Sequence, residues 1–270
     1  MYKRQALIIA VVFVISELVC VACVPERPVA CDEKPGKISD MFKALFKNDQ
    51  AMTVVVSIIL VYTSLNICGN LVLYFFRFDV GNEGAYSIFA AVAFAAQVLV
   101  MMVIPLLRKR FSKSQLFISG FIIQIAGFAV ILIMAFAKLY TPQSWYILCL
   151  PGILIYLGYG MLNVIMTIFL SDSVDYGEVM NGTREESVIF SMQTFTVKLA
   201  SGVAVFLAGL VVDWIHLDTA AAVQTQDTLD ALRMWMTIPS VILLIVGIFV
   251  FKRFYKLDDT RMEEIKSKLN

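Results

Sequence analysis

The chain contains 270 residues, of which 60% are hydrophobic and 16% are charged, and its formal net charge at pH 7 is +1. A single soluble core of this length cannot bury so much apolar surface, and the apolar residues occur in long runs. The composition therefore excludes an ordinary soluble globular protein and indicates a polytopic membrane protein.

Seven runs of about 18 to 25 mainly apolar residues are each long enough to cross the hydrocarbon core of a bilayer as a helix. They cover residues 6–24, 52–76, 85–107, 114–137, 145–170, 188–213 and 234–251. We therefore predict an all-α polytopic membrane protein with seven transmembrane helices.

Lys and Arg accumulate in the cytoplasmic loops of membrane proteins, so their distribution predicts the orientation. Most fall in one set of loops: Arg27, Lys34, Lys37, Lys43, Lys47, Arg108, Lys109, Arg110, Lys113, Arg184, Lys252, Arg253, Lys256, Arg261, Lys266 and Lys268. The opposite side has only Lys3, Arg4, Arg77, Lys138 and Arg233. The carboxyl terminus is therefore predicted to be cytoplasmic, and topology explains the basic residues without a nucleic-acid partner.

The first five residues, Met-Tyr-Lys-Arg-Gln, conflict with this orientation because they place two basic residues outside. They match what a common sequencing-library transposon end would encode, and we expect an artefact fused to a truncated gene. Segment 25–50 contains several prolines and predicts a cytoplasmic linker. One helix (1–24), this linker, a six-helix half (51–251) and a tail (252–270) are what remains when a carrier of two six-helix halves is cut before its sixth helix.

Two acidic residues, Asp172 and Asp175, follow the fifth predicted span at a spacing that places them on one face of a helix end. Two interpretations stay open. The residues form a solvated helix end, or they form a cytoplasmic gate whose charges pair with basic residues elsewhere and separate as a carrier opens inward. Glu186, three residues after Thr183, fits a capping box that starts the next helix.

Lys198 lies within the apolar run 188–213. A charged side chain inside a membrane span costs about 3 kcal/mol or more, so it usually faces a polar cavity. The alternative is a side chain that snorkels to the membrane interface. Lys198 is several turns from either end of its run, which favours the cavity.

Other residues of this run form two stripes at helical spacing. One stripe is polar and contains Ser191, Thr194, Lys198 and Ser201. The other consists of small residues, Ala200, Ala204 and Ala208, and suits close contact with a neighbouring helix. Together the stripes are typical of a helix that lines a cavity.

The sequence Ser-Asp-Ser-Val-Asp-Tyr-Gly-Glu at 171–178, followed by Arg184, Phe190-Ser-Met-Gln-Thr-Phe195 and Lys198, resembles a known signature. It is similar to the last two helices of the glycoside-pentoside-hexuronide:cation symporters, a family of the major facilitator superfamily. The chain resembles the sixth to twelfth helices of that family, most specifically over 163–209. Asn66-Ile-Cys-Gly-Asn70, followed by Tyr74, gives weaker support.

The resemblance implies cation-coupled (Na⁺ or H⁺) uptake of a sugar or glycoside by alternating access, in the inner (plasma) membrane of a bacterium. It implies no catalytic residue, resident metal or cofactor. The implied substrate and cation cavity contains Lys198, Gln193, Thr194, Asn163, Asn70 and Tyr74. The implied cytoplasmic gate contains Asp172, Asp175 and Arg184. Asn163 stands where melibiose permease, a member of the family, is expected to have an aromatic residue, which puts galactoside specificity in doubt.

In that family, the carboxylates that hold the cation lie in the first half, which this chain does not contain. The only acidic residue deep within a predicted span is Glu17, whose neighbours match no motif. We therefore expect the chain alone to be inactive in coupled transport and to require a missing amino-terminal half. Cys20 and Cys23 form a C-x-x-C pair, but no second such pair follows, and His216, the only histidine, is almost 200 residues away, so chance explains the pair better than a metal site.

Two other functions stay open. A carrier of the same superfamily for a lipid or another solute would have a more apolar cavity than the polar stripe through Lys198 suggests. A retinal-binding seven-helix protein would carry its lysine in the last helix beside a carboxylate counter-ion. Lys198 instead lies in the sixth predicted helix of seven, which disfavours that function.

Overall fold

The computed structural model describes residues 2–23, 46–182, 186–221 and 223–269. The chain divides into two units, Met1–Lys37 and Ile38–Asn270. Most of the predicted linker 25–50, Thr183 and the gate residue Arg184 fall outside the described residues. Each unit is considered separately below.

Helix α1, Tyr2–Cys23, is the described part of the first unit. It matches the predicted helix 6–24, and Glu17 is exposed on it. Its apolar part, Ile9–Cys20, is shorter than a full membrane span, whereas six helices of the second unit are long and apolar enough to cross a membrane. The described residues thus contain six candidate spans and one shorter apolar helix, where seven spans were predicted.

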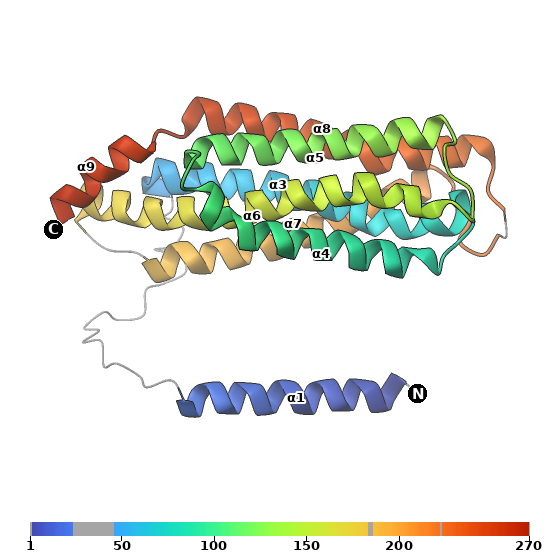
Figure 1. Ribbon diagram of the computed structural model, residues 1–270, viewed down its shortest axis with the longest axis horizontal. Coiled ribbons are helices and arrows are strands. Elements are labelled where there is room, and N and C mark those ends of the chain that lie inside the picture. The colour runs from blue at the N-terminus through green and yellow to red at the C-terminus, as the bar shows by residue number, and fades with distance from the viewer. Residues whose placement is uncertain (1, 24–45, 183–185, 222, 270) are drawn as a thin grey trace. The chain divides into compact units, whose positions relative to one another are not determined.

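The second unit is a bundle of six long helices that run side by side (Figure 1). Their bounds are α3 Asp49–Tyr74, α4 Ala85–Leu107, α5 Lys113–Phe136, α6 Cys149–Asn181, α7 Glu186–Trp214 and α8 Gln226–Phe254. A π-helical turn, Phe75–Asp79, extends α3, a 3-10 turn, Trp145–Leu148, precedes α6, and a short helix α9, Asp259–Leu269, follows α8. We call the end of the bundle that carries α9 the α9 end, and the other the far end.

Two of these helices are longer than the hydropathy pattern predicts. The predicted span 145–170 reaches Asn181 as a single helix, and the predicted span 234–251 begins eight residues earlier, at Gln226. Both extensions contain charged residues, which lower the mean hydropathy of the local sequence and so shorten the predicted span. The structure buries Asp172 in the first extension and Arg233 in the second, and each of them is paired with an opposite charge.

Helices α3 and α6 are the most buried of the six spans. Helix α3 packs against α6, α7 and α8, and α6 packs between α4 and α5. The predicted small-residue row on α7 is confirmed, because Ala200, Ala204 and Ala208 are all buried. Small side chains allow the backbones of two helices to approach closely where no hydrophobic driving force distinguishes protein from lipid.

Helices α5 and α6 cross at glycines. A Cβ atom on Gly158 would lie 2.5 Å from the carbonyl oxygen of Gly120 and 2.6 Å from the backbone nitrogen of Gln124. Those neighbours are backbone atoms of α5, so they cannot move aside as a flexible side chain would. The crossing distance of the two helices therefore depends on the absence of a side chain at residue 158.

We expect Gly158→Ala to destabilise the bundle by about 1–3 kcal/mol, the usual cost of overpacking a tight contact. Gly202→Ala is the matched control, since nothing lies within 4 Å of the Cβ it would add. There the change is expected to be neutral or stabilising by up to about 1 kcal/mol, because alanine favours helix. Thermal unfolding of both variants in detergent micelles measures the difference, and equal midpoints would contradict the close crossing.

The start of α3 and the end of α8 are joined at the α9 end by one buried side chain. The Gln50 side-chain amide donates to the carbonyl oxygen of Phe254 at 3.4 Å, and its oxygen accepts from the backbone nitrogen of Lys256 at 2.8 Å. Asn48 caps α3 and donates to the carbonyl oxygen of Ser173 in α6 at 2.8 Å. These contacts hold the first, fourth and last helices of the bundle together.

The far end contains a buried ion pair that the sequence pattern did not predict. The Arg233 guanidinium in α8 donates to both carboxylate oxygens of Asp79, at 2.8 and 2.5 Å, and also to Asp230 at 2.6 Å. The side chains of Arg233 and Asp79 are only 3% and 4% exposed. The Tyr140 hydroxyl donates to Asp79 at 2.6 Å. Burial, followed by this hydrogen bond, raises the pKa of Tyr140, so the hydroxyl stays a donor.

Candidate functional site

Four polar residues of α3 recur at every fourth position and so share one face: Tyr62, Asn66, Asn70 and Tyr74. All four are half-buried. The side-chain amide of Asn66 donates to the carbonyl oxygen of Tyr62, and that of Asn70 donates to the carbonyl oxygen of Asn66, both at 2.7 Å. These bonds fix the two amides on the helix and leave their oxygens as acceptors for a ligand.

A hollow of about 350 Å³ lies between this face of α3 and helix α7. It is lined by Asn70, Tyr74, Val205, Ala208, Gly209, Val212 and Asp213. Two predicted cavity residues therefore line one hollow together, and Asp213 adds a carboxylate that the sequence analysis did not single out. An amide, a phenol and a carboxylate are groups that hydrogen-bond the hydroxyls of a polar ligand.

Asn163 of α6 contacts the same face of α3. Its side-chain amide donates to the hydroxyl of Tyr62 at 2.5 Å. Tyr159, one turn earlier on α6, packs edge-on against the Tyr62 ring with 5.5 Å between ring centroids. A pair of tyrosines therefore stands beside Asn163, although residue 163 is not itself aromatic.

The predicted cavity residues of α7 do not line this hollow. Gln193 is half-buried, whereas Thr194 and Lys198 are exposed. Lys198 lies on the helix face opposite the buried alanine row, since two residues along a helix correspond to roughly half a turn. Its ammonium group makes no hydrogen bond or ion pair with any residue that the structure describes. Thr194 and Lys198 nevertheless share the face of α7 that carries Val205 and Val212, because residues seven apart lie on one side of a helix. They lie about two turns or more nearer the α9 end than the hollow.

The α9 end carries a cluster of charges around Asp172. Asp172 is buried and forms an ion pair with Lys113 at the start of α5. Asp259 of α9 lies 3.5 Å from the Lys113 ammonium and 3.3 Å from the Arg108 guanidinium. The interpretation of Asp172 as part of a solvated helix end is therefore wrong, since its side chain is buried and paired. The local sequence could not show this, because Lys113 lies 59 residues earlier in the chain. Asp175 is half-buried one turn further along α6.

Asp259 illustrates how this cluster holds α9. Burial raises the pKa of its carboxyl group, but the hydrogen bond from Arg108 and the charges of Lys113 and Arg108 outweigh that effect, and the pKa falls below its ordinary value. The carboxylate therefore stays ionised at neutral pH. Through Asp259, helix α9 contacts Arg108 and Lys113 at the loop between α4 and α5. Lys113 also pairs with Asp172, and this links α9 to α6.

Comparison with known proteins gives a consistent result. Residues 2–259 match the family described as MFS/sugar transport protein. The chain is 25% identical over 254 residues to an uncharacterized symporter, YjmB, of Bacillus subtilis, which covers 93% of this chain and 54% of that protein. It is 23% identical over 234 residues to the raffinose carrier protein of Pediococcus pentosaceus, covering 86% and 35%.

A third relative is the isoprimeverose transporter of Lactiplantibacillus pentosus, 25% identical over 256 residues, covering 94% of this chain and 51% of that protein. The chain thus spans about half the length of these curated relatives. The three relatives come from bacteria and are named as a symporter, a carrier and a transporter.

Proposed function

The chain belongs to the MFS/sugar transport protein family, a family of membrane transporters and not of enzymes, and on that premise we propose that it forms the carboxyl-terminal part of a sugar carrier. The carrier takes up a sugar or glycoside by alternating access around a central cavity. In this arrangement α3 to α8 are one six-helix half, and a second, amino-terminal half provides the opposite wall.

The observation that carries the proposal is the polar hollow between α3 and α7. A sugar gives up hydrogen bonds to water on binding, so its site must supply fixed donors and acceptors. The oxygens of Asn70 and Asp213 provide acceptors, and the ring of Tyr74 can stack on the apolar face of a sugar. Asn163, held by Tyr62, supplies a further amide on the neighbouring helix.

Lys198 supports the need for a second half. It is exposed near the middle of a span of 29 residues, with no counter-charge among the described residues. A cation in that position would be costly against lipid, so its face of α7, with Gln193 and Thr194 nearby, is assigned to the wall of an aqueous cavity. Carboxylates of the amino-terminal half would then neutralise Lys198 and bind the coupling cation, Na⁺ or H⁺.

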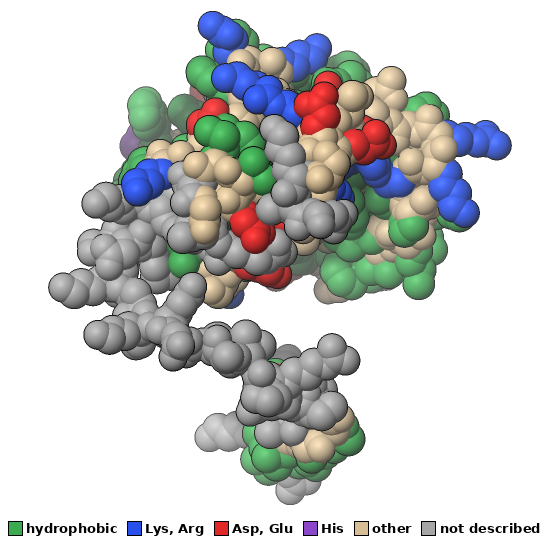
Figure 2. Space-filling model, turned by 90° about the vertical axis from the view of Figure 1, so that its left-hand side faces the viewer, with side chains coloured by type: hydrophobic (Ala, Val, Ile, Leu, Met, Phe, Trp, Pro, Cys, Tyr) green, Lys and Arg blue, Asp and Glu red, His purple; other side chains and the backbone are tan. Residues whose placement is uncertain are grey.

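The buried pair Asp172–Lys113 is assigned to the inner gate, together with Asp175 and Arg184. A buried charge pair has two well-defined states, closed and separated, which suits an element that changes as the carrier opens. We assign the gate to the cytoplasmic side. The Lys and Arg side chains that gather over the α9 end support this assignment (Figure 2), because such residues accumulate in cytoplasmic loops.

The test begins with the source DNA upstream of codon 6. If the reading frame continues into about five more helices, the complete protein is expressed in a transport-deficient bacterium beside the chain alone. Uptake of labelled raffinose, isoprimeverose and lactose is then measured with and without Na⁺ and proton gradients. We expect gradient-dependent uptake of at least one sugar by the complete protein, and none by the chain alone.

Each part of the proposal has its own contrary result. Uptake by the chain alone would show that no second half is needed. Uptake that ignores both gradients would remove cation coupling. A complete protein that is folded in the membrane but transports no sugar or glycoside of a wider panel would refute sugar transport itself.

A further inference from the structure

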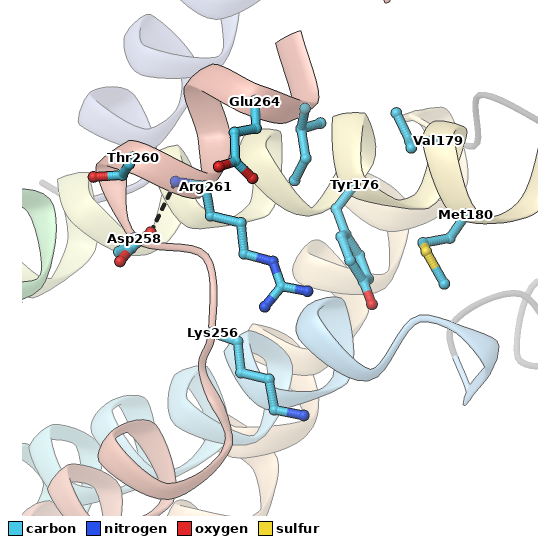
Figure 3. A pocket seen from close by; sticks show the side chains of 9 residues that line it. Tyr176, Val179, Met180, Lys256, Asp258, Thr260, Arg261 and Glu264 are labelled. Atoms are coloured by element: carbon cyan, nitrogen blue, oxygen red, sulfur yellow. Dashed lines mark hydrogen bonds between the residues drawn. The ribbon is translucent and has the colours of Figure 1, made fainter. Parts of the chain in front are cut away.

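A second pocket lies at the α9 end, away from the proposed sugar cavity. It has a volume of about 500 Å³ and is enclosed by the last turns of α6, the segment after α8, and α9 (Figure 3). Tyr176, Val179 and Met180 come from α6, and Lys256, Arg261 and Glu264 come from the carboxyl-terminal segment. None of these residues belongs to the predicted cavity or gate.

Two cationic side chains converge on this pocket. The guanidinium of Arg261 extends from α9 toward the segment that carries Lys256, and the ring of Tyr176 lies beside the guanidinium (Figure 3). Neither cation forms an ion pair with a described residue. Asp49 lines a neighbouring hollow that Lys256 also borders, but no ion pair joins the two, and its carboxylate instead accepts a hydrogen bond from the Tyr176 hydroxyl. By contrast, the nearby cations Arg108 and Lys113 both bind carboxylates.

The acidic residues at the pocket do not neutralise these cations. Asp258 accepts a hydrogen bond from the backbone nitrogen of Arg261 at 2.9 Å, so its carboxylate caps the amino-terminal end of α9. In Figure 3, the carboxylates of Asp258 and Glu264 lie beside the α9 backbone, whereas the guanidinium reaches away from both. The two cations therefore keep their donors available to a ligand in the pocket.

The pocket is held in shape by packing beneath it. Leu257, Met262 and Ile265 are buried against Tyr176, Val179 and Tyr255. Asp259 binds Arg108 and Lys113 on the other side of α9. Because α9 is fixed on two sides, the two cations are presented by a docked element, which lowers the entropic cost of binding.

We propose that this pocket binds a phosphate group between Arg261 and Lys256. The planar fork of an arginine matches two phosphate oxygens, and the lysine ammonium provides a second positively charged donor. The group is carried by an acidic phospholipid or by a soluble phosphate ester. The exposed apolar side chain of Met180, at the end of a membrane span, is where the glycerol and upper acyl region of a lipid would lie. This site is independent of the proposed transport function.

The experiment compares the purified chain with the double variant Lys256→Met/Arg261→Met. The matched control is Lys252→Met/Arg253→Met, which removes the same charge from exposed positions at the end of α8. Retention of phosphatidylglycerol is measured by native mass spectrometry after exchange from vesicles containing phosphatidylglycerol or only phosphatidylcholine. Inorganic phosphate and glycerol 3-phosphate are titrated separately in neutral detergent, with thermal stabilisation as the readout.

We expect phosphatidylglycerol retention to fall roughly 10- to 30-fold in the pocket variant and to remain unchanged in the control. Stabilisation by glycerol 3-phosphate without retention of phosphatidylglycerol would identify a soluble ester as the source. Equal losses in the two variants would indicate unspecific charge attraction and overturn the proposal, as would absence of binding in both arms. Because all four substituted residues are exposed, unchanged unfolding midpoints establish that each variant is folded.

Discussion

Replacing Arg233 with methionine is expected to lower the free energy of unfolding of the bundle by about 3–5 kcal/mol. Arg233 forms a two-pronged contact with Asp79, and both side chains are almost fully buried at the far end. Removal of the cation leaves the Asp79 carboxylate buried, with Tyr140 as its remaining donor among the described residues. The expected loss of stability comes mainly from keeping the unpaired Asp79 carboxylate away from water, and less from losing its attraction to Arg233. Unfolding in mixed detergent micelles measures it.

The double variant Asp79→Leu/Arg233→Met separates these contributions. With both charges removed, no charge is left uncompensated, and we expect most of the lost stability to return. Arg77→Met provides a control, because the Arg77–Glu83 pair two residues away is 43% and 59% exposed and should contribute less than about 1 kcal/mol. A loss in Arg233→Met no larger than in Arg77→Met would show that the Asp79 contact is not structurally important.

Replacing Lys198 with methionine is expected to reduce sugar uptake by the complete carrier by about 10- to 100-fold while leaving its stability unchanged. Hydrogen bonds to charged groups contribute about 1.5–3 kcal/mol each, which corresponds to this range. Lys198 makes no hydrogen bond or ion pair with the part of its bundle that the structure describes, so its loss should affect mainly what it binds across the cavity. Initial rates of labelled sugar uptake, normalised to the amount of protein in the membrane, measure the effect.

Two further variants separate this role from a general effect of charge. Lys198→Arg keeps the cation and should restore part of the uptake, together with its dependence on the coupling ion. Lys252→Met removes a lysine that is equally exposed at the end of α8, and uptake should remain near the parent level. If Lys252→Met and Lys198→Met lost uptake to the same degree, a specific role for Lys198 would be untenable.

The bundle could be predicted from the sequence because membrane spans are defined by local hydropathy. The predicted span 85–107 matches α4 at both ends, and 114–137 differs from α5 by one residue at each end. The failures occurred where charges are buried. Asp79 and Arg233 are 154 residues apart; Arg233 was counted as a loop charge, and Asp79 was not singled out. A hydropathy scale treats every charged side chain as exposed to water. Only the tertiary structure shows that a charged partner takes the place of water around these two side chains.

The candidate site was predicted less completely, for a related reason. Asn70 and Tyr74 were implied by a resemblance, and the structure brings them together in one hollow. Asp213 was missed because it stands at the last position of a predicted span, where an acidic residue looks like a helix end. Tyr62 was missed because its contact with Asn163 joins two helices separated by 101 residues.

The buried amide of Gln50 has a consequence for the order of assembly. Its two partners, the backbone at Phe254 and at Lys256, lie more than 200 residues later in the chain. At about 5–20 residues per second, the ribosome needs roughly 10 to 40 s to reach them after Gln50 is made. Helix α3 also packs mainly on α7 and α8, the last two spans of the bundle. The first helix of the bundle must therefore wait in the membrane, and the Gln50 contacts can form only when α8 has been synthesised.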